Sequence, residues 1–379
     1  MSKIRRVGMV AASVIAALFA ASVDTFAQGG LPNPYRPVQG LADGGGPYVP
    51  GGGWAKLPGG RQMGPPASVY IDIDGESLWA IIRCDETSPV PLAQGGRFGI
   101  DCLTPEGKIK DIDTVFKFNP QGEVVRSFGR GMFIWPHGLH IDREGNVWVT
   151  DAATTPAVAM AAKTGVKAGH QVVKFSPEGR VLMTLGEPGV AGNDERRLRS
   201  PSSVAIAQNG DIFVADGHEL NGNNRVMKFS RDGRYLMQWG KTGYGPGEFR
   251  TLHGIAIDMQ GRVYIADRNN NRIQLFDQQG KHLSTWLQFG TPSGIAFDDK
   301  GNIFVADSES DGVNNPGWEQ GIRIGDVRTG FVHSFILDQG GDPRTQTGSG
   351  PEFVAVDKYG NVFGGEPRPR VLRKYAKVR

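Results

Sequence analysis

Several signals of common protein classes are missing from this sequence. Beyond residue 27 it has no uncharged apolar stretch near the ~20 residues that a membrane-spanning helix requires. It contains no Gly-x-Ser-x-Gly elbow, no phosphate-binding Gly-rich loop and no His-Glu-x-x-His pair. Long amphipathic helical patterns are absent as well. The sequence therefore gives no support for these enzyme classes or for membrane and coiled-coil partners.

An excess of charge of one sign is also missing. The chain carries 42 Lys and Arg against 39 Asp and Glu, a formal net charge of +3. Removal of residues 1–27 would take away three basic side chains and Asp24, which leaves a net charge of +1. A nucleic-acid-binding protein needs a clustered basic face. We therefore expect no nucleic-acid partner.

Residues 1–27 have the pattern of a secretory signal peptide. Their basic start leads into an apolar run from about Met9 to Val23, followed by the small-residue stretch Thr25–Ala27. The apolar run is shorter than a membrane span, so we expect cleavage after Ala27 and export to the periplasm or the extracellular space. The mature chain would then have no membrane span. An uncleaved membrane anchor is the alternative.

Cysteine is scarce, with only Cys84 and Cys102 in 379 residues. An exported protein meets an oxidising compartment, where such a pair commonly forms a disulfide. Their separation of 18 residues would close a loop that stabilises the fold by roughly 3 kcal/mol. A pair of metal thiolates is the other interpretation, but the close Cys-x-x-Cys spacing of such sites is missing.

Glycine, by contrast, is abundant, and the 55 glycines recur in register. Residues 141–151 and 257–267 both contain an apolar strand, a turn with Gly145 or Gly261, and a second apolar strand that ends in Asp. Each unit predicts a β-hairpin, because a tight turn needs positive φ at its glycine. Further copies lie at Ala205–Asp216, Ile295–Asp307 and Val354–Glu366, with a degenerate copy at Val69–Ile82.

A second hairpin of alternating pattern follows the first, as in residues 171–182 and 271–286. Two hairpins make one four-stranded blade, so six repeats predict an all-β, six-bladed β-propeller over residues 51–379. The sixth blade lacks its last strand, and we expect Trp54–Leu57 to supply it and to cover the exposed edge. Residues 28–50, rich in Gly and Pro, are predicted to be a flexible lead.

Three further features are interpreted as structural. Irregular insertions are expected on the rims of the disc. Acids that recur at the strand ends are expected to accept backbone N–H bonds, and in-phase aromatic residues are expected to pack between blades. The insertions are residues 152–169, 187–200 and 311–319, the acids are Asp151, Asp216, Asp267 and Asp307, and the aromatic residues are Trp148, Phe213, Tyr264 and Phe304.

The first strand of each propeller blade lies innermost, so residues at one phase of the repeat converge on the central channel. His137 and His253 share this phase in the second and fourth blades, and Glu352 occupies it in the sixth. Because alternate blades are related by a pseudo-threefold axis, these side chains could bind one divalent ion and leave positions open for water or substrate. Ser203 and Ser293, assigned to the corresponding phase, are poorer ligands.

Two imidazoles and one carboxylate favour zinc, with iron or manganese as alternatives and calcium disfavoured. The alternative for His137 and His253 is that each is a buried side chain whose ring nitrogens bond to backbone groups. Two histidines in phase on alternate blades, with a carboxylate at the same phase of the third alternate blade, favour the metal-binding interpretation.

Four segments carry a resemblance to a known family: WPHGLHIDREGNVWVTD, VADGH with the following NNRVMKF, LHGIAIDMQGRVYIADRNNNRIQLFD, and the strand end at Arg83. Over residues 54–375 the sequence resembles the NHL-repeat propellers related to peptidyl-α-hydroxyglycine α-amidating lyase. NHL repeats alone say little about function, because the fold serves recognition domains, receptors and enzymes. The resemblance implies a lyase that cleaves an α-hydroxyglycine end to an amide and glyoxylate.

The resemblance also implies roles for single residues, with departures. Arg83 and Arg268 match arginines of the lyase site, where a guanidinium can grip a substrate carboxylate; surface salt bridges are the alternative. The family's third metal-binding His and the Asp after it are replaced by Glu352 and Phe353. The family's Tyr after Ala-Asp-Gly is replaced by His218, which could act as a general base, a fourth metal ligand or a rim residue.

Two functions follow as hypotheses. The first is a metal-dependent, lyase-type enzyme that acts on a small-molecule or peptide substrate with a carboxylate. In it the in-phase trio holds the ion, the two arginines hold the carboxylate, and His218 moves the proton. The second is a non-catalytic extracytoplasmic propeller that binds a protein, peptide or glycan with its rim loops. We expect a monomer in both cases.

Overall fold

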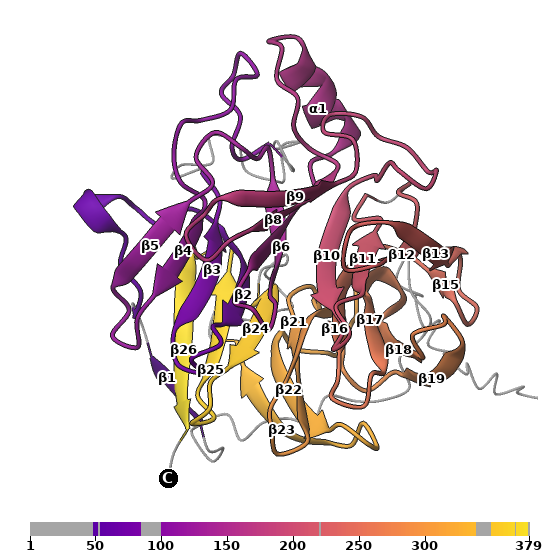
Figure 1. The fold of residues 1–379 in the computed structure, drawn as a ribbon. Coiled ribbons are helices and arrows are strands. Elements are labelled where there is room, and N and C mark those ends of the chain that lie inside the picture. The colour runs from indigo at the N-terminus through magenta and orange to yellow at the C-terminus, as the bar shows by residue number, and fades with distance from the viewer. Residues whose placement is uncertain are drawn as a thin grey trace, which may run out of the picture.

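Strands dominate the computed structural model of the protein, which describes residues 48–51, 54–84, 100–219, 221–338, 350–367 and 369–377. In this part of the chain, six four-stranded antiparallel sheets lie like blades around a central axis (Figure 1). The predicted six-bladed β-propeller is therefore confirmed. Its described residues include no helix with the length and apolar character needed to cross a membrane. The predicted signal peptide and most of the expected lead lie outside them.

Each of the first five blades uses four consecutive strands, and the first strands of neighbouring blades contact one another around the channel. The first blade consists of β2 (Pro66–Ile71), β3 (Leu78–Ile82), β4 (Val115–Phe118) and β5 (Val124–Phe128), and the second of β6 (Pro136–Ile141), β7 (Val147–Asp151), β8 (Gln171–Phe175) and β9 (Val181–Leu185). The third blade consists of β10 (Pro201–Ile206), β11 (Ile212–Asp216), β12 (Arg225–Phe229) and β13 (Tyr235–Trp239), and the fourth of β16 (Leu252–Ile257), β17 (Val263–Asp267), β18 (Arg272–Phe276) and β19 (His282–Trp286). The fifth blade consists of β20 (Pro292–Phe297), β21 (Asn302–Asp307), β22 (Gly321–Asp326) and β23 (Val332–Leu337), and the sixth contains β24 (Phe353–Val356), β25 (Val362–Glu366) and β26 (Val371–Lys377). A short parallel pair, β14 (Lys241–Thr242) and β15 (Glu248–Phe249), follows the third blade.

The inner hairpins turn at glycines, as the repeat predicts. Gly145 and Gly261 both have a φ of 79°, a conformation that residues with a β-carbon rarely adopt. Asp142 and Asp258 precede these turns, and each accepts the backbone N–H four residues further on, at 2.8 and 2.9 Å. The acid and the glycine together fix the tight turn between the first two strands of these blades.

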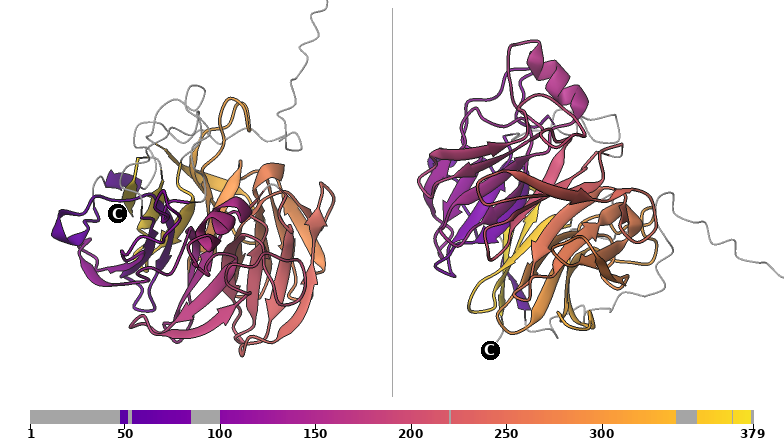
Figure 2. Two further views of the ribbon diagram at one scale, coloured as in Figure 1. Left: turned by 90° about the horizontal axis from the view of Figure 1, so that it is seen from above. Right: turned by 45° about the vertical axis from the view of Figure 1, so that its right-hand side comes forward.

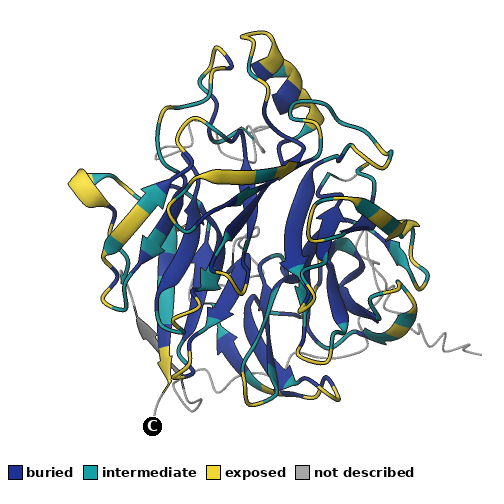
Figure 3. Cartoon of the chain, in the orientation of Figure 1, coloured by how far each residue is buried: buried dark blue, intermediate teal, exposed yellow. Residues whose placement is uncertain are grey.

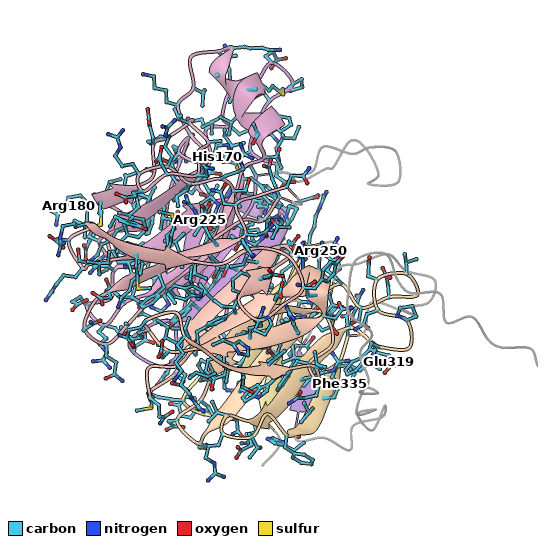
Figure 4. The ribbon with its side chains drawn as sticks, turned by 90° about the vertical axis from the view of Figure 1, so that its right-hand side faces the viewer. His170, Arg180, Arg225, Arg250, Glu319 and Phe335 are labelled. Atoms are coloured by element: carbon cyan, nitrogen blue, oxygen red, sulfur yellow. A yellow bond between two sulfur atoms is a disulfide. The ribbon has the colours of Figure 1, made fainter. Side chains whose placement is uncertain are left out.

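The acids that end the second strands are structural, as predicted. Asp216 accepts the backbone N–H of Arg199 at 2.6 Å and the Nε–H of Arg225 at 2.9 Å. Arg225 is a buried residue of the third strand of its blade and is labelled in Figure 4. In the second blade Asp151 accepts the backbone N–H of Trp135 at 2.8 Å instead. The acid–arginine pair recurs at 2.6–2.7 Å in Asp267–Arg272, Asp307–Arg323 and Glu366–Arg373.

The sixth blade is completed by a strand from the beginning of the described chain. β1 (Tyr48–Gly51) pairs antiparallel with β26, and the two lie side by side in Figure 1. The prediction that Trp54–Leu57 supplies this strand is wrong, because the donor lies a few residues earlier. Trp54 instead packs between the first and sixth blades, where its ring centroid is 6.0 Å from Phe118 and 5.2 Å from Phe363.

Apolar side chains between neighbouring blades form the core. Trp148 packs with Val204 of the third blade, and Tyr264 packs with Ile303 of the fifth. Phe213 and Phe304 occupy the equivalent seams, so the predicted role of all four aromatic residues is confirmed. Figure 3 shows buried residues throughout the inner strands, with exposed ones on outer strands such as β9 and on the turns. The channel is therefore surrounded by buried strands.

The second blade carries an insertion that stands out from the ring (Figure 2). Residues 152–169 contain the helix α1 (Thr155–Ala162), which begins after Thr154, whose side chain accepts the N–H of Ala157. The buried face of the helix packs in one cluster with Trp135, next to the channel strand β6. The predicted rim position of this insertion is confirmed, and it adds apolar cover beside one mouth of the channel.

A disulfide joins Cys84 to Cys102, as predicted. Cys84 follows Arg83 just beyond β3, so the bond also restrains that strand end. We expect the Cys84→Ser/Cys102→Ser variant to lose roughly 3 kcal/mol of the free energy of unfolding, because its unfolded chain is less constrained. Denaturant unfolding with and without reductant measures the loss. A reductant should destabilise only the wild type, and an equal effect on the variant would contradict the assignment.

Candidate functional site

The innermost strands of alternate blades place two histidines at the same end of the channel. His137 is the second residue of β6, and His253 is the second residue of β16. Glu352 directly precedes β24 at the equivalent register of the sixth blade. The third-blade counterpart is Ser202, so the repeat alignment that gave Ser203 is wrong by one residue.

Each of these histidines is oriented by a backbone carbonyl of the next blade. Nδ1 of His137 lies 2.7 Å from the carbonyl oxygen of Ser202, and Nδ1 of His253 lies 3.2 Å from that of Ser293. A carbonyl oxygen only accepts, so Nδ1 carries the proton in both rings and Nε2 has the free lone pair. Both Nε2 atoms are buried, with no hydrogen-bond partner among the described residues. Metal-binding histidines are commonly held in this way.

A third imidazole reaches the same place from a loop. His218 lies two residues beyond β11, and its backbone N–H donates to the carbonyl of Ser200 at 2.9 Å. Its ring centroid is 4.5 Å from that of His137 and 5.1 Å from that of His253. The ligand atoms of the three rings all lie within 4.8 Å of one another. In the part of the chain that the structure describes, this is the only such group of side chains that could hold a metal ion.

The surroundings keep all three imidazoles neutral near neutral pH. Burial, assisted by the charge on Arg83, holds the pKa of His137 well below its usual range. Burial and the charge on Arg268 lower the pKa of His253 in the same way. Burial and the neighbouring His137 lower the pKa of His218. Neutral imidazoles keep a free lone pair, so they need not release a proton before they bind a metal ion.

Glu352 forms an ion pair with Arg83 beside the histidines. Nη2 of Arg83 lies 3.4 Å from Oε2 of Glu352, and both side chains are buried. Nε of Arg83 donates to the carbonyl of Pro136 at 3.2 Å, and its guanidinium carbon lies 4.3 Å from the ring centroid of Trp135. Burial raises the pKa of Glu352, while Arg83 opposes that effect. Arg83 is therefore a buried residue of the site and not part of a surface salt bridge.

Arg268 is the second cation of the site. It begins the short 3-10 turn η3 (Arg268–Asn270) that follows β17, and its side chain is buried. Its Nη1 lies 3.7 Å from Oε1 of Glu309, and its Nε has no hydrogen-bond partner among the described residues. Arg268 therefore has donor capacity for a ligand, whereas Arg83 is held by a carboxylate, a carbonyl and an aromatic ring.

Trp135 lies two residues before His137, yet no functional role was predicted for it. Its ring centroid is 5.2 Å from that of His137 and 4.9 Å from that of His218, and it stacks under Arg83. Its position two residues before an in-phase histidine was the sequence signal that could have identified Trp135 as a residue of the site. Six predicted residues lie together at the end of the channel where the innermost strands begin: Arg83, His137, His218, His253, Arg268 and Glu352.

We expect the Arg83→Ala substitution to lower the free energy of unfolding by about 3 kcal/mol, because it leaves the carboxylate of Glu352 buried without its partner. Adding Glu352→Gln removes that lone charge and should restore most of the loss. Denaturant unfolding of the wild type, the two single variants and the double variant gives the coupling energy. Losses that simply add in the double variant would show that the two side chains do not interact.

Comparisons with known proteins agree with the propeller fold and identify proteins of similar sequence. A family model described as a 6-bladed beta-propeller matches residues 191–304. Peptidyl-glycine alpha-amidating monooxygenase B of Xenopus laevis is 38% identical over 171 residues, which cover 43% of this chain and 18% of the relative. Peptidyl-alpha-hydroxyglycine alpha-amidating lyase 1 of Drosophila melanogaster is 34% identical over 295 residues, which cover 71% of this chain and 49% of the relative.

Other matches extend the same pattern. NHL repeat-containing protein 3 of Mus musculus is 31% identical over 46% of this chain and 49% of the relative. A crystal structure of virginiamycin B lyase from Staphylococcus aureus has a TM-score of 0.50 at 11% identity and covers 87% of this chain and 98% of that chain; it supports the fold alone. The chain thus spans half or less of each of these three curated relatives. It is a six-bladed β-propeller related to the peptidyl-α-hydroxyglycine α-amidating lyases and to NHL repeat-containing proteins.

Proposed function

We propose that this protein is an exported, metal-dependent, lyase-type enzyme whose substrate is a small molecule or peptide with an α-hydroxyglycine end. The observation that carries the proposal is the group of three buried imidazoles whose ligand atoms lie within 4.8 Å of one another. A buried arginine beside this group, Arg268, suits a substrate with a carboxylate. Relatives named as amidating lyases point to the same chemistry. The disulfide supports export, because such bonds persist in oxidising compartments.

The residues present fit a divalent ion. His137 and His253 each direct a buried Nε2 lone pair that has no other partner among the described residues, while Nδ1 is held by a carbonyl. His218 completes a set of three imidazoles. This donor set suits zinc, with iron or manganese as alternatives. When bound, the ion would act as a Lewis acid on the hydroxyl or carbonyl oxygen of the substrate.

The geometry favours His218 over Glu352 as the third ligand. The carboxylate of Glu352 is outside the group of ligand atoms that lie within 4.8 Å of one another, and it pairs with Arg83. This exchanges the roles that the sequence suggested for the two residues. Glu352 then takes the proton of the substrate's hydroxyl group and returns it to the leaving amide nitrogen. The O–H and C–N bonds break, a C=O and an N–H bond form, and no net proton is consumed.

The two arginines have different tasks in this proposal. Arg268 retains a buried donor without a partner among the described residues, so it binds the substrate carboxylate. Arg83 is held by Trp135 and by the carbonyl of Pro136, and it keeps the carboxylate of Glu352 at the site. Arg268 would thereby orient the substrate carboxylate on one side of the reacting carbon, and Arg83 would hold Glu352, which carries the proton, in place beside it.

The test is glyoxylate release from N-benzoyl-α-hydroxyglycine by the purified mature protein. We expect release after zinc or cobalt has been restored and none after dialysis against a chelator. Protein that binds one equivalent of metal and releases no glyoxylate would remove the lyase assignment, and a non-catalytic binding propeller would become the better explanation. Release that a chelator does not affect would remove the metal from the proposal.

A further inference from the structure

The residue after the in-phase histidine belongs to a ring of small side chains around the channel. Crowding between inner strands explains their size. A β-carbon added to Gly138 would lie 2.5 Å from the carbonyl oxygen of Ser202, and one added to Gly254 would lie 2.3 Å from that of Ser293. Both distances are too short for a real contact, so glycine lets these strands approach. The ring consists of Ser68, Gly138, Ser203, Gly254 and Gly294, the third residues of their strands.

The sixth blade breaks this pattern with Phe353. By strand register it stands where Gly254 stands in the fourth blade. Its ring centroid is 5.5 Å from that of His137 and 5.4 Å from that of His253. These two histidines come from the second and fourth blades. A side chain of the sixth blade that contacts both must therefore extend into the centre of the channel.

Beyond Phe353 the channel contains a cavity of about 340 Å³. All six inner strands contribute to its walls, so the cavity is a continuation of the central channel. Its lining is mostly apolar, as at Val69 and Ile255, and Tyr70 and His140 provide polar groups. Phe353 is itself part of the lining. The same side chain therefore borders the histidines on one side and the cavity on the other.

We propose that Phe353 is a plug that closes the channel beneath the three histidines, separates them from this cavity and limits the size of a group that fits next to the metal. The inference rests on the proposed metal site for its functional meaning. It makes Phe353 a determinant of specificity: the wild-type site accepts a compact reacting end such as α-hydroxyglycine and rejects one with a bulky substituent on the reacting carbon. Removing the phenyl ring would join the site to the cavity.

The experiment compares imidazole and 4-phenylimidazole as ligands of the cobalt-loaded protein, measured by the visible cobalt spectrum. In the Phe353→Ala variant we expect 4-phenylimidazole to bind at least about tenfold more tightly than in the wild type, because its phenyl group can enter the vacated channel. The affinity for imidazole should stay within about twofold. Phe363→Ala is the matched control, since Phe363 is another buried phenylalanine of the sixth blade and packs against Trp54.

Equal affinities for 4-phenylimidazole in the wild type and Phe353→Ala would overturn the plug, as would the same gain in Phe363→Ala. If neither the wild type nor Phe353→Ala bound cobalt, the proposed metal site would be wrong. The crystal structure of Phe353→Ala would then test separately whether Phe353 closes the channel. A continuous solvent-filled channel between the histidines and the cavity would support it. A channel that stays closed by other side chains would overturn it.

Discussion

Replacement of His253 by Ala is expected to remove both the bound metal and the release of glyoxylate. The substitution takes away one of three buried imidazoles whose ligand atoms lie within 4.8 Å of one another. Metal-ion catalysis contributes several kcal/mol to transition-state stabilisation, so kcat/KM should fall on the order of 10³-fold. Metal analysis of protein purified without added metal and the glyoxylate assay measure the two effects on the same sample.

His333 provides the matched control, because it is an exposed histidine on β23, the outermost strand of the fifth blade. His333→Ala should retain metal and activity. One equivalent of metal on His253→Ala would contradict the proposed centre. The same measurement on His218→Ala and Glu352→Gln identifies the third ligand, since only the variant that has lost a ligand should lose the metal. Retention by His218→Ala with loss by Glu352→Gln would restore the assignment made from the sequence.

Replacement of Arg268 by Ala should lower kcat/KM for N-benzoyl-α-hydroxyglycine by about 10²–10³-fold, mainly through a higher KM. Loss of one partner of a buried, charge-assisted hydrogen bond costs roughly 2–5 kcal/mol, or about 30- to 5,000-fold, and the expected decrease lies in the middle of this range. Arg268 is buried and its Nε has no partner among the described residues, so its truncation mainly removes the 3.7 Å ion pair with Glu309. Steady-state kinetics on metal-loaded protein would measure the change.

A substrate analogue gives the control for charge. N-Benzoyl-α-hydroxyglycinamide lacks the carboxylate, so the wild type and Arg268→Ala should turn it over at similar rates. Arg180→Ala, at an exposed position labelled in Figure 4, should leave the kinetics of both compounds unchanged. An equal loss of activity on the amide and the acid in Arg268→Ala would show that Arg268 does not recognise the carboxylate.

The fold could be predicted because the repeat encodes the same local structure six times. Each hairpin depends on neighbours in the sequence, such as the turn at Gly145 and the strands on either side of it. The repeat phase also brought His137 and His253 together, since strand register determines which residues face the channel. Where the repeat was less regular, the alignment slipped by one residue and gave Ser203 for Ser202.

The roles of Glu352 and His218 depend on contacts that sequence spacing does not encode. Glu352 pairs with Arg83 across 269 residues, a contact that exists only once the first and sixth blades meet. His218 lies in a loop beyond the strand, where no register rule fixes its direction. The closing strand was misplaced for a similar reason. Tyr48–Gly51 lacks the clear alternating pattern of the other strands, and its pairing depends on the far end of the described chain.

Closure of the ring by β1 and β26 also predicts an order of folding. Each of the first five blades forms from strands that are consecutive in the chain, whereas Tyr48 pairs with Lys377. Contacts so distant in sequence form late, because a long loop must close before they contribute any stability. Arg83 belongs to the first blade and Glu352 to the sixth, so their ion pair forms with the same closing step. Folding intermediates with an open ring would therefore lack the complete site, and catalytic competence would appear only in the last kinetic phase of folding.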